Sequence, residues 1–307
     1  MKHKKPEHIR IATRKSRLAL WQAEWVQARL SALGVESALI LVETQGDREQ
    51  QPFHAMQGQG FFTKAVQQAV LEGRADIAVH SLKDLPAASE EGLTLAAVPC
   101  RADARDTLLV RRSSLCLEAD GLPLHTQASV GTSSARRQAQ LLHTRSDLQV
   151  RPLRGNVPTR IEKLLHGEYD AIVLAEAGLQ RLEIEVDCVR IMMAPSRFVP
   201  APGQGALAIE CRSEEVQIQS WLEAHLQDQQ AAQEVYLERA VMARLEGGCQ
   251  LALGAHACLN TPEKPSGAEL EGELFLFYAQ QSHHLEGAFA GLMSEACNAL
   301  GLEDGVQ

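Results

Sequence analysis

Residues 76–86 read DIAVHSLKDLP, and this stretch decides the fold class. Its first residues, through Val79, form a short apolar run that is typical of a strand buried on both faces of a sheet. The next five residues, HSLKD, contain four polar side chains, and Pro86 then stops the strand. Open α/β sheets bind ligands beyond the C-terminal ends of their strands, so this polar end predicts a ligand site.

Apolar strands and helical segments alternate on both sides of this stretch. The expected strands are 9–13, 38–42, 77–79, 93–98, 107–110, 129–131, 148–151, 171–174 and 206–211, and the expected helices are 18–33, 62–71, 135–143, 157–165, 214–227 and 230–245. After them come strand-like runs at 251–259 and 269–278 and a helix near 287–300. The alternation predicts mostly parallel sheets with helices on both faces, followed by a smaller α+β part.

Composition excludes several classes of protein. The 307 residues carry a formal charge of −9, which argues against a general surface for nucleic acid or anionic membranes. The N-terminal residues lack the apolar run of a signal peptide, and no segment has the ~18 continuous apolar residues of a membrane span. Seven scattered cysteines without a CxxC pair indicate reduced thiols in a cytosol, and we expect no metal site.

Positive charge is concentrated in one segment of this acidic chain. Residues 131–160 contain six arginines against one acid, Asp147. Such a segment is either a solvated basic face or a local site for anions. The second interpretation predicts a ligand that carries several negative groups, because arginine pairs in bidentate fashion with carboxylate and phosphate.

Two further predicted strand-to-helix junctions are polar like HSLKD. One reads GTSS at 131–134 and is followed by two arginines, and the other reads RGNVPTR at 154–160. Ser133 or Ser134 can cap the first helix and Asn156 the second, and Pro158 suits a first helical turn. A capped helix start alone is ordinary, but three such junctions with several cations attached predict an anion site at helix N-termini.

Two side chains suggest chemistry as well as binding. Asp84 is an acid among cations: it either forms a surface ion pair with Lys83 or faces a cationic reaction intermediate. Cys249 follows two glycines in LEGGCQ at 245–250, after a predicted helix. It is either an ordinary buried thiol or a nucleophile and attachment point.

With these motifs identified, the chain resembles the porphobilinogen deaminase family, also called hydroxymethylbilane synthases. The matching motifs occur in the family's order between residue 10 and about residue 255: RIATRKS at 10–16, FFTKAV at 61–66, ADIAVHSLKDLP at 75–86, VGTSSARRQ at 130–138, LRGNVPTR at 153–160, DAIVLAEAGLQRL at 170–182, PGQGALAIECR at 202–212 and LEGGCQ at 245–250.

The resemblance implies an α/β fold with two domains like those of periplasmic binding proteins and a smaller C-terminal α+β domain. Domain 1 would comprise residues 1–101 and 202–222, domain 2 residues 106–200, and domain 3 residues 223–307. It implies a transferase of tetrapyrrole (heme) biosynthesis that joins four porphobilinogens head to tail, releases ammonia and yields hydroxymethylbilane. It also implies a dipyrromethane cofactor attached as a thioether to Cys249, and a monomeric cytoplasmic enzyme that needs neither nucleic acid nor membrane.

The resemblance also implies roles for individual residues. The catalytic residue would be Asp84. The cofactor-binding residues besides Cys249 would be Ser81, Lys83, Thr132, Ser134, Arg136, Arg137, Arg154, Gly155 and Ala175. The substrate-binding residues would be Arg14, Ser16, Arg154, Arg160, Arg181 and Gln204.

Several positions depart from the family pattern. Residues 54–60 lack the family's usual lysines, with Ala55 and Gln59 among them, and Gln45 replaces the usual Arg or Thr. Glu176 replaces a small or neutral residue, and LA at 251–252 replaces Val-Pro. These changes leave two alternatives open: a non-catalytic paralogue, or a polycarboxylate-binding protein on the same fold. The presence of Cys249 and Asp84 argues against both.

Overall fold

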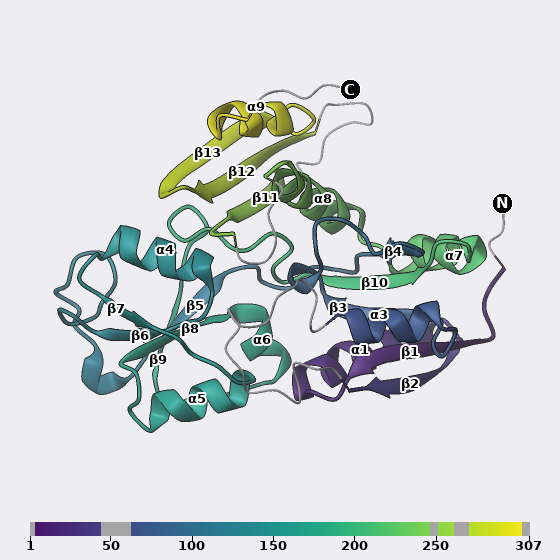
Figure 1. Cartoon of the computed structure of the whole chain (residues 1–307), viewed down its shortest axis with the longest axis horizontal. Helices are drawn as coiled ribbons and strands as arrows, with labels where there is room; N and C mark the ends of the chain where they lie inside the picture. Colours follow the sequence, from purple (N-terminus) through teal and green to yellow (C-terminus); the bar gives the residue numbers. More distant parts are fainter. Residues whose placement is uncertain (1–3, 44–62, 246–250, 261–269, 303–307) are drawn as a thin grey trace. The chain divides into compact units, whose positions relative to one another are not determined.

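The computed structural model describes residues 4–43, 63–245, 251–260 and 270–302 (Figure 1). The expectations for Gln45, the 54–60 segment and Cys249 lie outside these residues. The chain divides into two compact units: unit 1 comprises residues 1–102 and 205–233, and unit 2 comprises residues 103–204 and 234–307. The boundaries expected for three domains stay a prediction.

Unit 1 contains one five-stranded sheet in the order β2-β1-β3-β10-β4. Its strands are β1 (His8–Arg14), β2 (Glu36–Val42), β3 (Ile77–Ser81), β4 (Leu93–Ala97) and β10 (Leu207–Arg212). Strand β1 runs parallel to β2 and β3, whereas β10 runs antiparallel to both of its neighbours. The prediction of a mostly parallel sheet is therefore confirmed, with one reversed strand.

Helices cover both faces of this sheet, as predicted. Helices α1 (Arg17–Ala32) and α7 (Val216–Leu226) pack on one face, and α3 (Lys64–Leu71) packs on the other. Each face has its own cluster of buried apolar side chains because alternate strand residues point to opposite faces. Ser16 caps α1, with its side chain accepting a hydrogen bond from the backbone N–H of Ala19.

Unit 2 repeats this arrangement in its first part. Strands β5 (Asp106–Val110), β6 (Ser129–Gly131), β7 (Gln149–Arg151), β8 (Ala171–Ala175) and β9 (Val189–Met192) form a sheet in the order β7-β6-β8-β5-β9. Strand β5 runs antiparallel to β8 and β9, whereas β6 is parallel to β7 and β8. Strand β9 was not predicted, because this four-residue edge strand has too few apolar residues to show a period.

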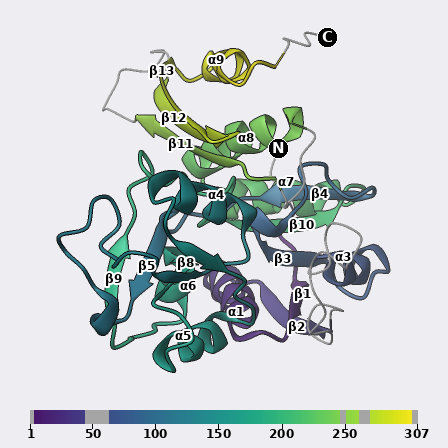
Figure 2. The same ribbon diagram turned by 60° about the vertical axis from the view of Figure 1, so that its left-hand side comes forward.

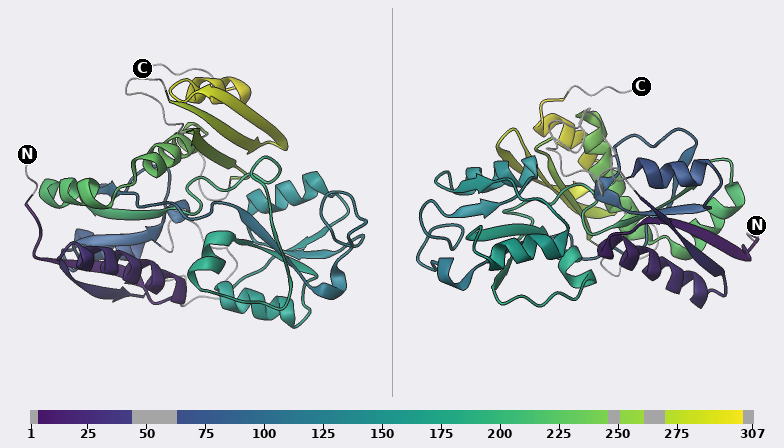
Figure 3. Two further views of the ribbon diagram at one scale, coloured as in Figure 1. Left: turned by 180° about the vertical axis from the view of Figure 1, so that it is seen from behind. Right: turned by 60° about the horizontal axis from the view of Figure 1, so that its bottom comes forward.

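Helices lie on both faces of the unit 2 sheet (Figure 3). Helix α4 (Ala135–Thr144) packs on one face, and α5 (Val157–Leu165) and α6 (Glu176–Arg181) pack on the other. The short helix α6 was not predicted. Helix α6 starts directly where β8 ends, so the sequence shows no boundary between the strand and these six residues.

The C-terminal part of unit 2 is a small α+β layer (Figure 2). Strands β11 (Gly254–Asn260), β12 (Glu271–Tyr278) and β13 (Gln281–Ala288) form an antiparallel sheet, and α8 (Gln229–Arg244) and α9 (Leu292–Ala299) pack on one of its faces.

Strand β13 was missed, and the predicted helix near 287–300 is correct only from residue 292. Strands β12 and β13 are joined by Ala279 and Gln280, whose φ angles are +50° and +64°. A two-residue hairpin turn with left-handed backbone normally contains Asn or Gly, which makes it recognisable in the sequence. This turn contains neither residue. Among the described residues, no helix is long and apolar enough to cross a membrane.

Candidate functional site

Two of the three predicted junctions, GTSS and RGNVPTR, lie in unit 2 and meet at one edge of its sheet. Strands β7, β6 and β8 are neighbours and run parallel, so their C-terminal ends lie together, beside the start of the reversed strand β5. Ser134 caps α4 by accepting a hydrogen bond from the Arg137 N–H, and Asn156 caps α5 through the Thr159 N–H. Both capping predictions are confirmed, and the arginines of these junctions are thereby brought to one edge.

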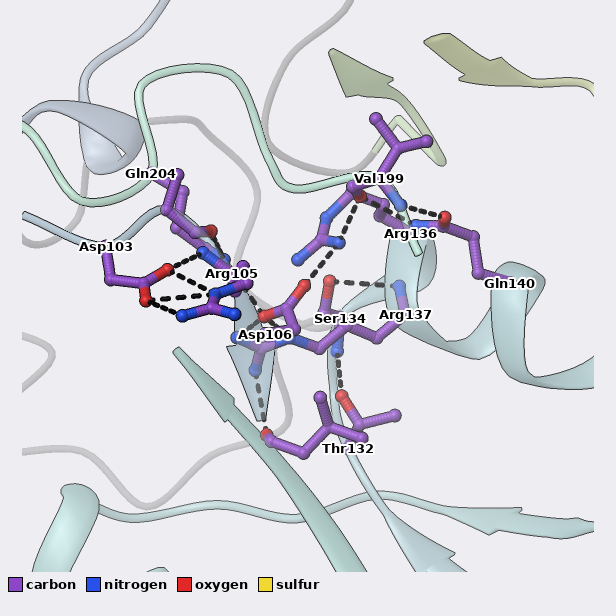
Figure 4. Close-up of polar contacts among 12 residues, drawn as sticks. Asp103, Arg105, Asp106, Thr132, Ser134, Arg136, Arg137, Gln140, Val199 and Gln204 are labelled. Atoms are coloured by element: carbon purple, nitrogen blue, oxygen red, sulfur yellow. Dashed lines mark hydrogen bonds and ion pairs between the residues drawn. The ribbon is translucent and has the colours of Figure 1, made fainter. Parts of the chain in front are cut away.

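A buried carboxylate, Asp106, organises this edge (Figure 4). Arg137 donates from Nε and Nη2 to Asp106 Oδ1 at 3.0 and 2.6 Å. Arg136 Nη1 lies 2.7 Å from Asp106 Oδ2. Gln204 Nε2 donates to Asp106 Oδ1 at 3.0 Å and to the Ala104 carbonyl at 2.7 Å. We call Asp106, Arg136, Arg137 and Gln204 the Asp106 cluster.

Backbone carbonyls hold both guanidinium groups in place. Arg137 Nη1 donates to the Val173 carbonyl at 2.9 Å, and Arg136 Nη1 donates to the Val199 carbonyl at 2.6 Å. Gln140 fixes Val199 in turn: its Nε2 donates to the Val199 carbonyl at 2.9 Å, and its Oε1 accepts from the Val199 N–H at 2.6 Å. The arginines are therefore preorganised by fixed partners.

The Asp106 cluster carries more positive than negative charge. Two arginines surround one aspartate, and no member is more than 6% exposed. Burial lowers the pKa of Arg136; the Asp106 charge raises it, and the Arg137 charge lowers it again. Burial also lowers the pKa of the nearly buried Arg181, at the end of α6, to about 10. A ligand with several carboxylates fits this environment, because each anionic group would stabilise the cations.

Polar side chains next to the cluster join the strand ends. Ser133 Oγ donates to the Leu153 carbonyl at 2.9 Å and accepts from the Leu153 N–H at 3.1 Å, which ties the end of β6 to the segment after β7. Thr132 Oγ1 accepts from the Ser134 N–H at 3.2 Å. Gly155 has φ +110°, and a Cβ there would lie 2.9 Å from the Thr159 side chain. Only glycine fits without a shift of Thr159.

Glu176, which replaces a small or neutral residue of the family pattern, has its charge neutralised by a partner in the sheet. Its carboxylate is ion-paired with Arg190 on β9 and accepts hydrogen bonds from Thr107 Oγ1 at 2.6 Å and Gln180 Nε2 at 2.9 Å. Glu176 is 1% exposed. The added negative charge therefore has its own partners and does not draw on Arg136 or Arg137.

Unit 1 contains the other predicted site residues. Lys83 and Asp84 lie in a 3₁₀ turn, Leu82–Asp84, directly after β3, and Asp84 is exposed. Ser81 Oγ accepts a hydrogen bond from Gln22 Nε2 of α1 at 2.7 Å. Arg14 ends β1, the parallel neighbour of β3, so it lies at the same edge of the sheet.

The polar run that ends β3 divides into two roles. His80 is buried, and its Nε2 lies 3.2 Å from Glu210 Oε2 on the neighbouring strand β10. Gln67 of α3 donates to both Glu210 oxygens at 3.0 and 3.2 Å. His80 therefore belongs to a buried structural network, whereas Lys83 and Asp84 are accessible to ligand.

Three residues that support the strand ends were not predicted from the sequence. Asp106, Gln140 and Glu210 pair with side chains or backbone at sequence separations of 31 to 143 residues. The available signal was an acid inside a buried strand pattern, as in Asp106 before TLLV and in Glu210 within LAIEC. Among the described residues, no group of three or more His, Cys, Asp or Glu side chains could hold a metal ion.

Residues 9–220 match the model of the porphobilinogen deaminase dipyromethane cofactor binding domain, and residues 232–281 match that family's C-terminal domain. The porphobilinogen deaminase of Nitratidesulfovibrio vulgaris strain DP4 is 46% identical over 82% of this chain and 79% of its own. That of a Nitratiruptor species is 44% identical over the same shares.

One solved structure from the comparison is much less similar. A putative periplasmic sulfonate-binding protein from Methylobacillus flagellatus covers 77% of this chain and 69% of its own, at 12% identity and a TM-score of 0.40. The assignment therefore rests on the sequence matches, which span most of the chain. On that evidence, the chain belongs to the porphobilinogen deaminase family.

Proposed function

We propose that this chain joins four porphobilinogen molecules head to tail, releases one ammonia for each, and yields hydroxymethylbilane. Membership of the family makes it a transferase of tetrapyrrole biosynthesis. The Asp106 cluster is the observation that supports the activity most directly, because each pyrrole of the substrate carries an acetate and a propionate. A buried edge with excess positive charge suits such acid side chains.

The cofactor proposed for this chain is dipyrromethane, joined to Cys249 by a thioether. When bound, it supplies the primer to which substrate rings are added. The residues proposed to hold it are Ser81, Lys83, Thr132, Ser134, Arg136, Arg137, Arg154, Gly155 and Ala175. The residues proposed to bind incoming substrate are Arg14, Ser16, Arg154, Arg160 and Arg181.

Asp84 is the proposed catalytic residue. Its exposed carboxylate can accept hydrogen bonds from pyrrole N–H groups and stabilise the cation left on the substrate ring when ammonia departs. Opposite unit charges 4 Å apart attract by about 4 kcal/mol at an effective dielectric near 20. Lys83, the preceding residue, can bind an acid side chain of the same ring.

Other side chains are proposed to act through these contacts. Gln204, expected from the family to bind substrate, uses its Nε2 on Asp106 and the Ala104 carbonyl, so we propose that it positions the Asp106 cluster. Asp106 and Gln140 have the same role, because they fix the guanidinium groups. We further propose that the enzyme acts as a cytoplasmic monomer, without nucleic acid or membrane, and that it has the three predicted domains.

The intact mass of the purified chain tests this function. The wild-type chain should exceed its polypeptide mass by one dipyrromethane, and Cys249→Ser should have the bare mass and no turnover. Cys297→Ser, at a buried thiol of α9, is the matched control and should keep both the adduct and activity.

Two results would contradict the proposal. An adduct mapped by peptide mass spectrometry to another cysteine would exclude Cys249 as the attachment point. A loaded protein that releases no ammonia from porphobilinogen would favour the non-catalytic paralogue.

A further inference from the structure

In the C-terminal part of unit 2, a histidine side chain lies between a cysteine and a glutamate and is close to both. His256 and Cys258 are two residues apart on β11, so both side chains point to the same face of the strand. Cys258 Sγ lies 3.3 Å from His256 Nε2. The other ring nitrogen, Nδ1, lies 3.3 Å from Glu238 Oε1 on α8. This order of groups is the one that activates a nucleophile through a base and an orienting acid.

Backbone donors hold the side chain of Glu238 in place. Glu238 is fully buried; its Oε2 accepts from the Gly203 N–H at 2.6 Å, and its Oε1 accepts from the Ala257 N–H at 2.9 Å. Backbone donors favour the ionised form of a carboxyl group. The carboxyl group beside His256 is therefore held in a fixed position by donors that favour its charged form.

A second carboxylate, Asp103, also acts on His256. Burial raises the pKa of Asp103, but hydrogen bonds from Arg105 and the charges of Arg105 and His256 together lower it below its usual value. His256 is itself nearly buried, and its ring stacks on Phe275 of the neighbouring strand with centroids 6.5 Å apart. The His256 ring therefore has an aromatic neighbour and a carboxyl group that fix its position beside Cys258.

We propose that Cys258 is a nucleophilic thiol, activated by His256, that forms mixed disulfides with small cationic disulfides. In the reaction the thiol proton passes to His256 Nε2, and Cys258 Sγ attacks one sulfur of the small disulfide. The old S–S bond breaks as the new one forms, and the second sulfur leaves as a thiolate. No net oxidant is needed, because the small disulfide is reduced as Cys258 is oxidised.

The preference for a cationic partner follows from the sheet register. Cys258 pairs with Glu273 on β12, which pairs with Glu286 on β13, so both carboxylates share the face of Cys258. Directly paired side chains in an antiparallel sheet have Cβ atoms roughly 5 Å apart. Glu273 Oε2 also lies 3.0 Å from His284 Nε2. The two acids attract a positively charged reagent and repel a negatively charged one.

The test compares two disulfides of similar length and opposite charge on the purified full-length protein. The protein is treated with cystamine or with 3,3′-dithiodipropionate, and the modified cysteines are quantified over time by peptide mass spectrometry. Cys100 is the internal reference: its thiol is exposed, and its Sγ lies 4.0 Å from the Arg101 carbonyl. His256→Gln and Glu273→Gln are the matched variants.

We expect cystamine to modify Cys258 at least about tenfold faster than Cys100, although Cys258 is the less exposed thiol. His256→Gln should remove this advantage and leave the Cys100 rate unchanged. Glu273→Gln should reduce the difference between the rates at which cystamine and dithiodipropionate modify Cys258. Added salt should have the same effect.

Equal rates at Cys258 and Cys100 in the wild-type protein would overturn the proposal without any variant. So would an unchanged Cys258 rate in a folded His256→Gln protein. A fast reaction without charge preference would disprove the cationic partner class. None of these readouts depends on turnover of porphobilinogen, so they are independent of the proposed function.

Discussion

The two five-stranded sheets share one pattern and use it differently. Each has three neighbouring parallel strands and one reversed strand, and in each the predicted ligand residues follow strand ends. In unit 2 the strand ends carry the buried Asp106 cluster, whose charged side chains form ion pairs with one another and hydrogen bonds with backbone carbonyls. In unit 1 the end of β3 carries Asp84, which is exposed, and Lys83, which is partly exposed.

This difference agrees with the proposed division between preorganised binding in unit 2 and chemistry in unit 1. Buried charges with fixed partners cannot move without a large loss of stability, so they suit a ligand that stays in place. An exposed carboxylate contributes little to stability, which agrees with the catalytic role proposed for Asp84. Substitutions in unit 2 should therefore affect folding and loading, whereas substitutions at Asp84 should affect rate alone.

The largest effect is expected at Asp106. Asp106→Asn removes the anion between two buried arginines, and it should lower the free energy of unfolding by about 3–5 kcal/mol. Denaturant unfolding measures the change. Asp187→Asn is the matched control, because Asp187 pairs with Arg112 on the open surface, and its stability should equal that of the wild type. A loss at Asp106 no larger than in the control would show that the cluster is not what stabilises unit 2.

Asp84→Asn should leave stability and cofactor content unchanged and reduce turnover by roughly 10²–10³-fold, as for loss of one preorganised electrostatic group. Asparagine keeps the shape and one acceptor but cannot neutralise a cation. Ammonia release and intact mass, measured on one preparation, give both quantities. Near-normal turnover would mean that the cation is stabilised by another group, and the assignment of chemistry to unit 1 would fail.

Arg154→Ala should weaken the hold on the growing chain by about 1.5–3 kcal/mol, the usual value of a charge-assisted hydrogen bond. Intermediates of shorter length should accumulate, and they are visible as mass steps of one pyrrole unit. Arg151→Ala is the control, since Arg151 is an exposed cation three residues earlier that donates to the Glu168 carbonyl. The same pattern of intermediates in both variants would indicate a loss of general charge, not of a specific contact.

The smallest effect is expected at Asp76 in unit 1. Burial raises the pKa of Asp76, but side-chain and backbone hydrogen bonds from Arg10 outweigh it, and the net pKa is lowered. A lowered carboxyl pKa contributes stability above the ordinary value near 4, and this contribution is lost as the pH falls through the folded-state value. Asp76→Asn should therefore cost roughly 1 kcal/mol at pH 7 and less as the pH falls below 4. A constant loss from pH 7 to pH 3 would contradict this linkage.

The sequence was most informative where the interactions are local. The caps at Ser134 and Asn156 act within three residues, and both were predicted. The strands with continuous apolar runs were also predicted, because a fully buried strand is recognisable from a few consecutive apolar residues. Strand β13 was not, since its polar, half-exposed residues and its Ala-Gln hairpin carry no local mark.

The charged partners depended on tertiary structure instead. The arginines of residues 131–160 indicate a local anion site, but a spacing pattern does not show that Asp106 lies between two of them or that Arg190 neutralises Glu176. His80 and Asp84 are both polar residues at the end of the strand motif DIAVHSLKDLP, and the sequence does not distinguish their environments. In the structure His80 is buried against Glu210, whereas Asp84 is exposed. Hydrophobic period and capping follow from neighbours along the chain, whereas a charge acquires its partner and its burial only when distant strands meet at one edge of a sheet.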